Sequence, residues 1–259
     1  HVEIIESLDI GDFDASAKMS GNGFYLLKGK LALLNQALIR FAIDCMYKKK
    51  YTYIEPPLLL KHDILRAATD LETLQNTIYP IEGESLDLIG TSEYSLLGMH
   101  SNEVIKEEDL PKKYFSYTMC FRKEIGSHGI NEKGLWRTHQ FNKVEQFIFC
   151  SPKDSEKYYD ELLRNSEEII KKLKLPYRIL EMCSGDLSLW KARSADIEVY
   201  RPTTKEYGEV GSLTNCTSYQ AQNLNIKVLR KDGTKELLHT LNNTAMATSR
   251  VLVAIMEHY

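Results

Sequence analysis

The sequence of 259 residues lacks the features that mark several classes of protein. It has no continuous run of 18 apolar residues, and its first residues, HVEIIESLDIGDF, show no basic start followed by an apolar stretch. We therefore expect no membrane span and no signal peptide. The formal net charge of -3 gives no overall basic excess, so a nucleic-acid partner would meet only a local surface. We expect a soluble, cytoplasmic protein with no membrane partner.

Cysteine is sparse and scattered. The five cysteines stand singly, without a C-x-x-C pair, at Cys45, Cys120, Cys150, Cys183 and Cys216. An odd number of unpaired, widely spaced cysteines is typical of buried thiols in a reducing compartment. We expect no structural zinc site from this pattern.

No internal repeat or low-complexity tract is present, and the composition is that of a globular protein. Hydrophobic residues make up 43% of the chain and charged residues 27%, which favours one large domain with a substantial core. Residues 1–28 contain Gly11, Gly21 and Gly23 between short apolar patches and predict a connecting segment. Residues 29–259 then form the main domain.

Periodicity predicts three long helices and a cluster of strands. The helices are expected to begin at Gly29, to span 154–173 and to run from about Ala245 to the C-terminus. Strands are expected at 77–81, 86–89, 113–122 and 137–150, and in the later stretches IEVYRP, YGEVGSLTN, IKVLRK and ELLHTLNN. Because no regular helical crossovers separate these strands, we expect an α+β fold whose sheet is mainly antiparallel, with helices packed on one side.

The stretch CFRKEIGSHGINEKGLWRTHQFNKVE, residues 120–145, carries unusual polar residues on two predicted strands. Strand alternation puts Arg122 and Glu124 on one face of the first arm, and Arg137, His139, Phe141, Lys143 and Glu145 on one face of the second. At about 3.3 Å per residue, Phe141 and Glu145 stand about 13 Å apart, close to the length of an adenosine phosphate with a small acyl group.

Two interpretations of this polar face remain open. Arg122 could grip a phosphate or carboxylate, Phe141 could stack on a purine, and Glu145 could bind an ammonium group. Alternatively, the face is exposed and its charges form cross-strand ion pairs.

The same stretch resembles motif 2 of the class II aminoacyl-tRNA synthetases in its seryl form. Further segments resemble other family motifs in the same order: TSE at 91–93, CSGDL at 183–187, EVGSLTNCTSYQA at 209–221, and motif 3 in HTLNNTAMATSRVLVAIMEHY at 239–259. The resemblance implies a six- to seven-stranded, mainly antiparallel sheet flanked by helices, with the active site on the sheet.

The resemblance also implies roles for individual residues. The catalytic groups would be Arg122, Arg250 and Glu209. Glu209 and Ser212 would bind Mg²⁺. ATP would be bound by Arg122, Lys123, Glu124, Thr138, Phe141, Glu209, Val210, Gly211, Ser212 and Arg250. Serine would be bound by Thr91, Ser92, Glu93, Arg122, Glu145, Asn242 and Thr244.

The implied activity is the ATP-dependent conversion of L-serine to seryl-adenylate and transfer of the seryl group to the 3′ end of tRNA(Ser), with tRNA(Sec) as a second acceptor. The stretch KYTYIEPPLLL, residues 50–60, resembles the family's motif 1. A homodimer is implied through this motif 1 region. In that region Pro57 fits the family pattern but Lys50 replaces a glycine. Ser127, His128 and Lys133 of the motif 2 loop are candidates for contact with ATP or the tRNA acceptor end.

Several departures leave alternatives. Gln222 and Asn223 replace a pair of arginines, and Ala245 and Ser249 replace glycines of bacterial members, as in the archaeal and eukaryotic cytosolic branch. No sustained heptads predict the family's N-terminal tRNA-binding arm, so we expect a catalytic-domain fragment. The alternatives are an armless homologue that passes an activated amino acid to a carrier protein, and a non-catalytic paralogue that serves as a binding module.

Overall fold

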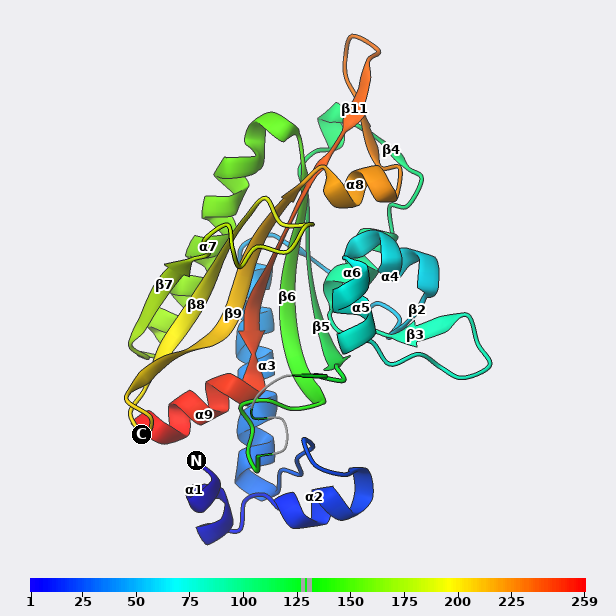
Figure 1. The fold of residues 1–259 in the computed structure, drawn as a ribbon. Helices are drawn as coiled ribbons and strands as arrows, with labels where there is room; N and C mark the ends of the chain where they lie inside the picture. The colour runs from blue at the N-terminus through cyan, green and yellow to red at the C-terminus, as the bar shows by residue number, and fades with distance from the viewer. Residues whose placement is uncertain (127–128, 130–131) are drawn as a thin grey trace.

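The fold is built on one twisted, seven-stranded sheet. A computed structural model describes residues 1–126, 129 and 132–259, and Figure 1 shows the sheet crossing its centre. The strands follow the spatial order β1 (Thr52–Tyr53), β5 (Lys112–Phe121), β6 (Gln140–Cys150), β12 (His239–Ala247), β9 (Glu206–Thr217), β8 (Arg193–Arg201) and β7 (Tyr177–Glu181). Only β1 and β5 pair in parallel within this sheet. The predicted α+β class and mainly antiparallel sheet are confirmed.

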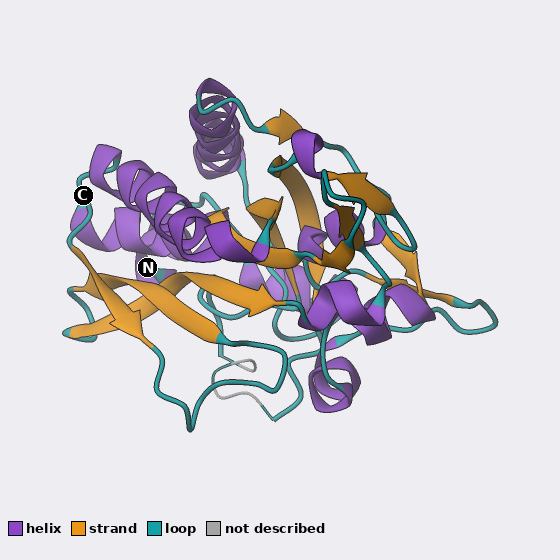
Figure 2. Cartoon of the chain, turned by 90° about the horizontal axis from the view of Figure 1, so that it is seen from above, coloured by secondary structure: helices purple, strands orange, loops and turns teal. Residues whose placement is uncertain are grey.

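Three helices cover one face of the sheet. They are α3 (Gly29–Lys48), α7 (Ser155–Lys172) and α9 (Thr248–His258), and Figure 2 shows helices along one face, with loops and a few further helices at one end of the other. Val144 and Ile148 of β6 point into this layer, where they join the apolar faces of the three helices in the main core. The helical periodicity that predicted α3 and α7 thus reflects burial of one helix face.

The expectation that helices pack on one side only is wrong. Three short helices, α4 (His62–Ala68), α6 (Ser92–Gly98) and α8 (Tyr219–Asn223), build a second core on the opposite face. Phe147 and Phe149 of β6 supply its floor, because alternate residues of a strand face opposite ways. The second core covers only one end of the sheet, which leaves the rest of that face for a cavity.

Small elements surround these two layers. They are α1 (Val2–Ser7), α2 (Phe13–Ser20), α5 (Leu71–Thr77), the short 3-10 helices at Glu107–Asp109 and Pro152–Asp154, the pair β2 (Leu59–Lys61) and β3 (Leu86–Leu88), and the sheet of β11 (Lys235–Leu237), β10 (Lys227–Leu229) and β4 (Val104–Lys106). Ile5 and Phe13 of the N-terminal segment join the main core. The division at residue 28 stays a prediction.

Some predicted boundaries differ from the structure. The strand expected at 77–81 is absent from the described backbone: α5 ends at Thr77, and only Pro80 forms an isolated bridge with Asp87. The last helix begins at Thr248 rather than Ala245, because the preceding residues complete a central strand between β6 and β9. Pairing with two neighbouring strands outweighs the local helical pattern there.

The chain ends lie near each other (Figure 1), and His1 Nδ1 lies 3.6 Å from Glu257 Oε1. Throughout the described residues, every helix is too short or too polar to cross a bilayer.

Candidate functional site

A cavity of about 370 Å³ opens on the sheet face that carries the second core. Strands β6, β8, β9 and β12 supply its floor, and the segments around Thr91, Arg122 and Arg250 supply its walls. The predicted site residues that line it are Thr91, Glu93, Arg122, Glu124, Thr138, Phe141, Glu145, Glu209, Val210, Gly211, Ser212, Asn242, Thr244 and Arg250. Residues that are more than 150 positions apart in the chain therefore meet in one site.

Two predicted site residues lie outside this cavity. Ser92 is fully buried, and Lys123 borders a separate hollow of about 280 Å³ beside His62 and Asp87. Of the loop candidates, Ser127 and His128 fall outside the described residues, and Lys133 pairs with Asp14 at 2.7 Å.

The contacts of Arg122 with the described residues leave the two terminal nitrogens of its guanidinium free to bind an anion. Its Nε donates to the carbonyl of Gly90 at 3.0 Å, and its guanidinium lies 5.3 Å from the Phe141 ring centroid. Among the described residues no carboxylate forms an ion pair with Arg122, so both terminal nitrogens stay available for a bidentate contact. Burial opposes the charge of Arg122, but Tyr94, Glu124 and other acidic groups outweigh it and raise the pKa.

Arg250, at the start of α9, occupies the opposite wall. Its Nη1 lies 3.0 Å from Glu209 Oε2 and donates to the Glu209 carbonyl at 2.8 Å. Its Nε donates to the carbonyl of Trp136 at 3.0 Å. The Trp136 ring lies beneath both arginine side chains of this corner, 5.5 Å from Arg250 and 4.2 Å from Arg201. This stacking fixes the direction of Arg250.

Glu209 and Ser212 share the cavity face because β9 contains a bulge. Residues three apart on a regular strand face opposite sides of the sheet. In β9, however, Ile197 pairs with Gly211 and Glu198 with Glu209, so Val210 has no cross-strand partner. The extra residue returns Glu209 to the side of Ser212.

Asp196 stands opposite Ser212 in the register and completes an acidic corner. Burial and the charge of Glu209 raise the pKa of Asp196 to about 6. Burial would also raise the pKa of Glu209, but Arg250 and Arg122 outweigh it and lower that pKa. A carboxylate and a hydroxyl with a second carboxylate close by suit Mg²⁺, which prefers oxygen ligands and completes its shell with water and phosphate.

β12 contains a second bulge beside the first. Thr244 pairs with Glu145 and Met246 with Val144, which leaves Ala245 unpaired. Thr244 Oγ1 lies 3.3 Å from Glu145 Oε2. Lys143 Nζ reaches the same carboxylate oxygen at 2.8 Å and Thr91 Oγ1 at 2.6 Å. These groups form a buried polar pocket at the end of the cavity nearest the second core.

Glu93 lies in the same pocket and accepts a hydrogen bond from Gln220 Nε2 at 2.7 Å. Burial and the nearby charge of Glu145 raise the pKa of Glu93 to about 7. The charges of Lys143 and Lys191 partly oppose this rise, and a further positive charge in the pocket would favour the ionised form of Glu93.

Comparison with known proteins identifies the family. Residues 77–259 match the family model described as the tRNA synthetase class II core domain (G, H, P, S and T). The chain belongs to the class II tRNA synthetases. It is 48% identical over 259 residues to a serine–tRNA ligase of Thermoplasma volcanium, covering 100% of this chain and 58% of that protein.

Solved synthetase structures agree with this assignment. A crystal structure of seryl-tRNA synthetase from Pyrococcus horikoshii complexed with ATP matches with a TM-score of 0.97 and 42% identity, over 99% of this chain and 58% of that one. Cytoplasmic serine–tRNA ligase from Naegleria fowleri in complex with AMP matches with a TM-score of 0.94 and 36% identity, over 100% and 62%. The chain thus spans about three fifths of the length of these relatives.

The synthetase cavity also contains residues to which sequence reasoning gave no role. They are Thr73, Thr77, Tyr94, Trp136, Met182, Ser188, Trp190, Lys191, Asp196, Thr214, Ala247 and Ser249, together with Arg137 and Lys143 of the hairpin. The sequence pattern around Asp196 could have identified it, since it alternates with the apolar Ala195 and Ile197 as a polar residue on one face of a strand does. Trp136 had none, because its place depends on Arg201 and Gly208, which are distant in the sequence.

The structure bears on both interpretations of the synthetase hairpin, and the binding roles of its residues stay a prediction. Arg122, Phe141 and Glu145 line the cavity, yet Arg137 Nη1 also pairs with Glu124 Oε2 at 2.6 Å. His139 precedes β6 and turns away from the cavity, with its ring 5.1 Å from that of Phe24.

Proposed function

We propose that this chain is the catalytic domain of a serine–tRNA ligase, which converts L-serine and ATP to seryl-adenylate and transfers the seryl group to the 3′ end of tRNA(Ser). The observation that carries this proposal is that one cavity joins the buried polar pocket around Glu145 to the site of Arg122, Arg250, Glu209 and Asp196. The similarity to serine–tRNA ligases across the whole chain supports this choice of amino acid.

The polar pocket suits serine. In this proposal Glu145 and Glu93 receive the substrate ammonium, and Thr91, Asn242 and Thr244 bond its polar atoms. Thr244 Oγ1 is already held by Glu145 at 3.3 Å. A buried pocket built to hydrogen-bond a hydroxyl rejects alanine strongly, because its polar groups are then left unpaired.

The other end of the cavity suits ATP. Phe141 supplies a ring for the adenine, while Glu124 and Thr138 face the base and Arg250 lies against the terminal phosphate. Val210, Gly211 and Ser212 provide backbone along β9. Glu209 and Ser212 would hold Mg²⁺, which neutralises phosphate charge when bound.

The first reaction step needs no general base. The ionised carboxylate of serine attacks the α-phosphorus, the bond to the bridging oxygen breaks, and pyrophosphate leaves with the electron pair. Arg122 lies between the two ends of the cavity, where it can hold the serine carboxylate and the α-phosphate in line. Catalysis then comes from positioning and from neutralising charge.

In the second step the 3′-hydroxyl of the terminal adenosine of tRNA attacks the seryl carbonyl, and AMP leaves. We propose tRNA(Ser) as the acceptor, with tRNA(Sec) as a second acceptor, a cytoplasmic location, and a homodimer that uses the motif 1 region. The non-catalytic alternative is less well supported, since Arg122, Glu145, Glu209 and Arg250 are all retained and all line the cavity.

The decisive experiment is serine-dependent exchange of labelled pyrophosphate into ATP in the presence of Mg²⁺. We expect exchange with serine, weak exchange with threonine, and none above background with alanine or glycine. Binding of ATP to the same sample, measured by calorimetry, controls for folding. A folded sample that binds ATP but shows no serine-dependent exchange would rule out the proposed activity.

A further inference from the structure

A group of buried polar side chains lies on the sheet face opposite the cavity, inside the apolar core. It contains Gln146 of β6, Ser166 of α7 and Asn243 of β12, with relative exposures of 0%, 1% and 0%. We refer to these three residues as the polar clamp. Because buried polar groups are costly unless they are hydrogen-bonded, their partners indicate what such a group is for.

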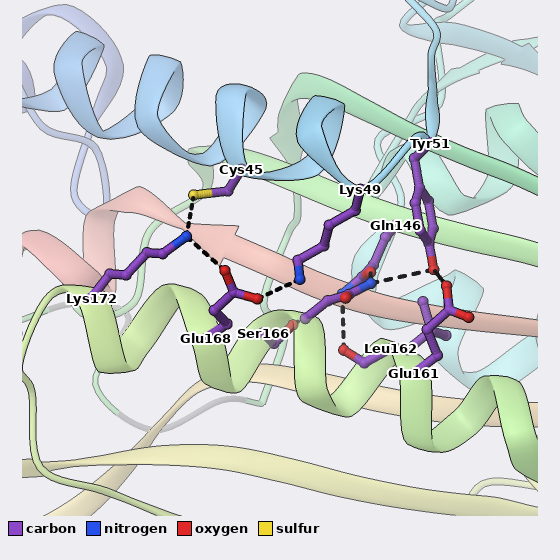
Figure 3. Close-up of polar contacts among 10 residues, drawn as sticks. Cys45, Lys49, Tyr51, Gln146, Glu161, Leu162, Ser166, Glu168 and Lys172 are labelled. Atoms are coloured by element: carbon purple, nitrogen blue, oxygen red, sulfur yellow. Dashed lines mark hydrogen bonds and ion pairs between the residues drawn. The ribbon is translucent and has the colours of Figure 1, made fainter.

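The clamp ties α7 to the two central strands. Gln146 Nε2 donates to the Leu162 carbonyl at 3.1 Å and to Asn243 Oδ1 at 2.6 Å, and it lies 3.1 Å from Ser166 Oγ. Figure 3 shows Gln146, Leu162 and Ser166 meeting between the helix and the sheet. Gln146 and Asn243 are direct partners in the β6–β12 register, immediately next to the pair of Glu145 and Thr244 in the serine pocket.

The clamp also holds the backbone of two cavity residues. Ser166 Oγ has one hydrogen to share between two acceptors, Asn243 Oδ1 and, at 3.2 Å, the carbonyl of Thr244. Asn243 Nδ2 donates to the carbonyl of Ser212 at 2.8 Å. These carbonyls flank the two strand bulges, where Val210 and Ala245 have no partner in the register. The ladder is interrupted at these points, so side chains replace strand pairing in holding the backbone.

A small void lies beside the Ser166 hydroxyl. The void between the bulges, lined by Ser166, Val210, Gly211, Thr244 and Ala245 among others, measures about 10 Å³. That is at the lower limit for a single water molecule. Loss of the Ser166 hydroxyl would enlarge this void and remove the fixed contacts that Ser166 makes with Asn243 and with the Thr244 carbonyl.

We propose that Gln146, Ser166 and Asn243 are positioning residues that set where Thr244 and Ser212 stand in the cavity. This inference rests on the proposed function, because Thr244 is assigned there to the serine hydroxyl and Ser212 to the magnesium site. The clamp touches neither substrate. It acts through the two carbonyls, and Ser166 in particular acts on serine recognition.

The outer contacts of α7 provide a matched control. Tyr51 OH donates to Glu161 Oε1 at 2.8 Å and accepts from Asn165 Nδ2 at 3.3 Å, and Lys172 links Cys45 and Glu168 (Figure 3). Asn165 Nδ2 also donates to Gln146 Oε1 at 3.0 Å, a contact that loss of the Tyr51 hydroxyl leaves in place. Among the described residues, none of these contacts reaches β12. Tyr51→Phe removes a buried hydroxyl from the same interface without touching either bulge.

The test compares Ser166→Ala, Ser166→Thr and Tyr51→Phe in serine-dependent pyrophosphate exchange. For Ser166→Ala we expect the KM for serine to rise about tenfold and the preference for serine over alanine to fall by a similar factor. The KM for ATP should change less. Ser166→Thr keeps the hydroxyl and should restore most of the serine KM, whereas Tyr51→Phe should keep wild-type kinetics despite a lower melting temperature.

Gly211→Ala tests the same geometry without removing a hydrogen bond, in case Ser166→Ala does not fold. A Cβ at Gly211 would lie 3.0 Å from the Thr244 carbonyl oxygen and 3.2 Å from its Cβ, so Thr244 must shift and the KM for serine should rise. Unchanged serine KM and selectivity in the folded variants, beside an active wild type, would overturn the clamp. An inactive wild type in the same assay would instead count against the proposed function.

Discussion

Glu93 is a carboxylate whose surroundings bring its pKa close to neutral pH. Burial and the charge of Glu145 raise its pKa to about 7, whereas a glutamate in an unfolded chain releases its proton near about pH 4.3. Between these values the folded state binds more protons than the unfolded state. The free energy of unfolding should therefore fall as the pH rises from about 4.5 to about 7 and then level off.

Glu93→Gln should remove the share of this pH dependence that Glu93 contributes, whereas Asp196, whose pKa is raised to about 6, keeps its own. We expect the variant to be about as stable as wild type at pH 5 and more stable at pH 8, by on the order of 2 kcal/mol. Urea unfolding at the two pH values measures the difference. The exposed Glu82→Gln is the matched control and should retain the wild-type slope; an unchanged slope in Glu93→Gln would mean that Glu93 is not the titrating group.

In the proposed reaction Arg122 serves both ends of the cavity. Arg122→Ala removes the guanidinium that lies against Phe141 and bonds to Gly90. We expect pyrophosphate exchange to fall at least about a hundredfold, because charge neutralisation is lost at the reacting phosphate. The fold should be retained, as judged by circular dichroism.

Arg164→Ala serves as the control for Arg122→Ala. Arg164 is an exposed residue of α7, so its loss should leave exchange unchanged. Near-normal exchange in Arg122→Ala would show that the assignment of the motif 2 arginine is wrong.

At the scale of elements, Gly208 near the start of β9 packs against the Trp136 ring, and the same ring lies against Arg250. A Cβ added at Gly208 would lie 2.3 Å from Trp136 Cζ2 and 2.8 Å from its Cη2. Since Arg250 Nε bonds to the Trp136 carbonyl, a displaced indole should disturb Arg250 as well.

Gly208→Ala should therefore raise the KM for ATP more than the KM for serine, by roughly tenfold, and cost about 1–3 kcal/mol in stability from overpacking. Steady-state exchange kinetics and thermal unfolding measure these effects. Gly185→Ala is the control, because the nearest atom to its added Cβ would be Cys183 Sγ at 3.9 Å. Equal changes in the two KM values would point to general destabilisation instead.

The elements that the sequence predicted well are those with a long, regular pattern. Helices α3 and α7 and the arms β5 and β6 appear within a few residues of the expected bounds, since each buries one face along its whole length. The same alternation and the order of the motifs brought Arg122, Phe141 and Glu145 to one site.

The features that the sequence did not predict depend on contacts between residues that are distant in the chain. The unpaired Val210 and Ala245 follow from how β9 meets β8 and β6 meets β12, and no local pattern encodes such a register. The pairing of Asp196 with Ser212 and the position of the Trp136 ring also depend on residues that are distant in the sequence. The predicted strand at 77–81 failed because Pro80 and its neighbours find only one bridge.

At the scale of the molecule, two exposed apolar side chains of α3 bear on assembly. Leu33 and Tyr47 are 70% and 71% exposed, and their separation of 14 residues puts them on one side of the helix. Arg40 and Asp44 lie between them and pair with each other at 2.9 Å. Tyr47 lies just before the motif 1 region, through which we propose the dimer to form.

We expect a solution mass near twice the 29.8 kDa of one chain, measured by light scattering coupled to size exclusion. Tyr47→Glu should shift the mass to that of the monomer, because it places a charge in the proposed contact. Leu180→Glu, on the strand β7 at the other edge of the sheet, should remain dimeric. A monomeric wild type would remove the proposed homodimer while leaving the cavity intact.

The bulge at Val210 makes the spacing of Glu209 and Ser212 along the chain differ from their spacing along the sheet. Because Glu209 already pairs with Glu198 and Gly211 with Ile197, deletion of Val210 would regularise the pairing of β9 with β8 and leave Glu209 two positions from Ser212, on the same face. An alignment of related sequences that opens a one-residue gap at 210 would therefore not mean that a proposed metal ligand has been lost.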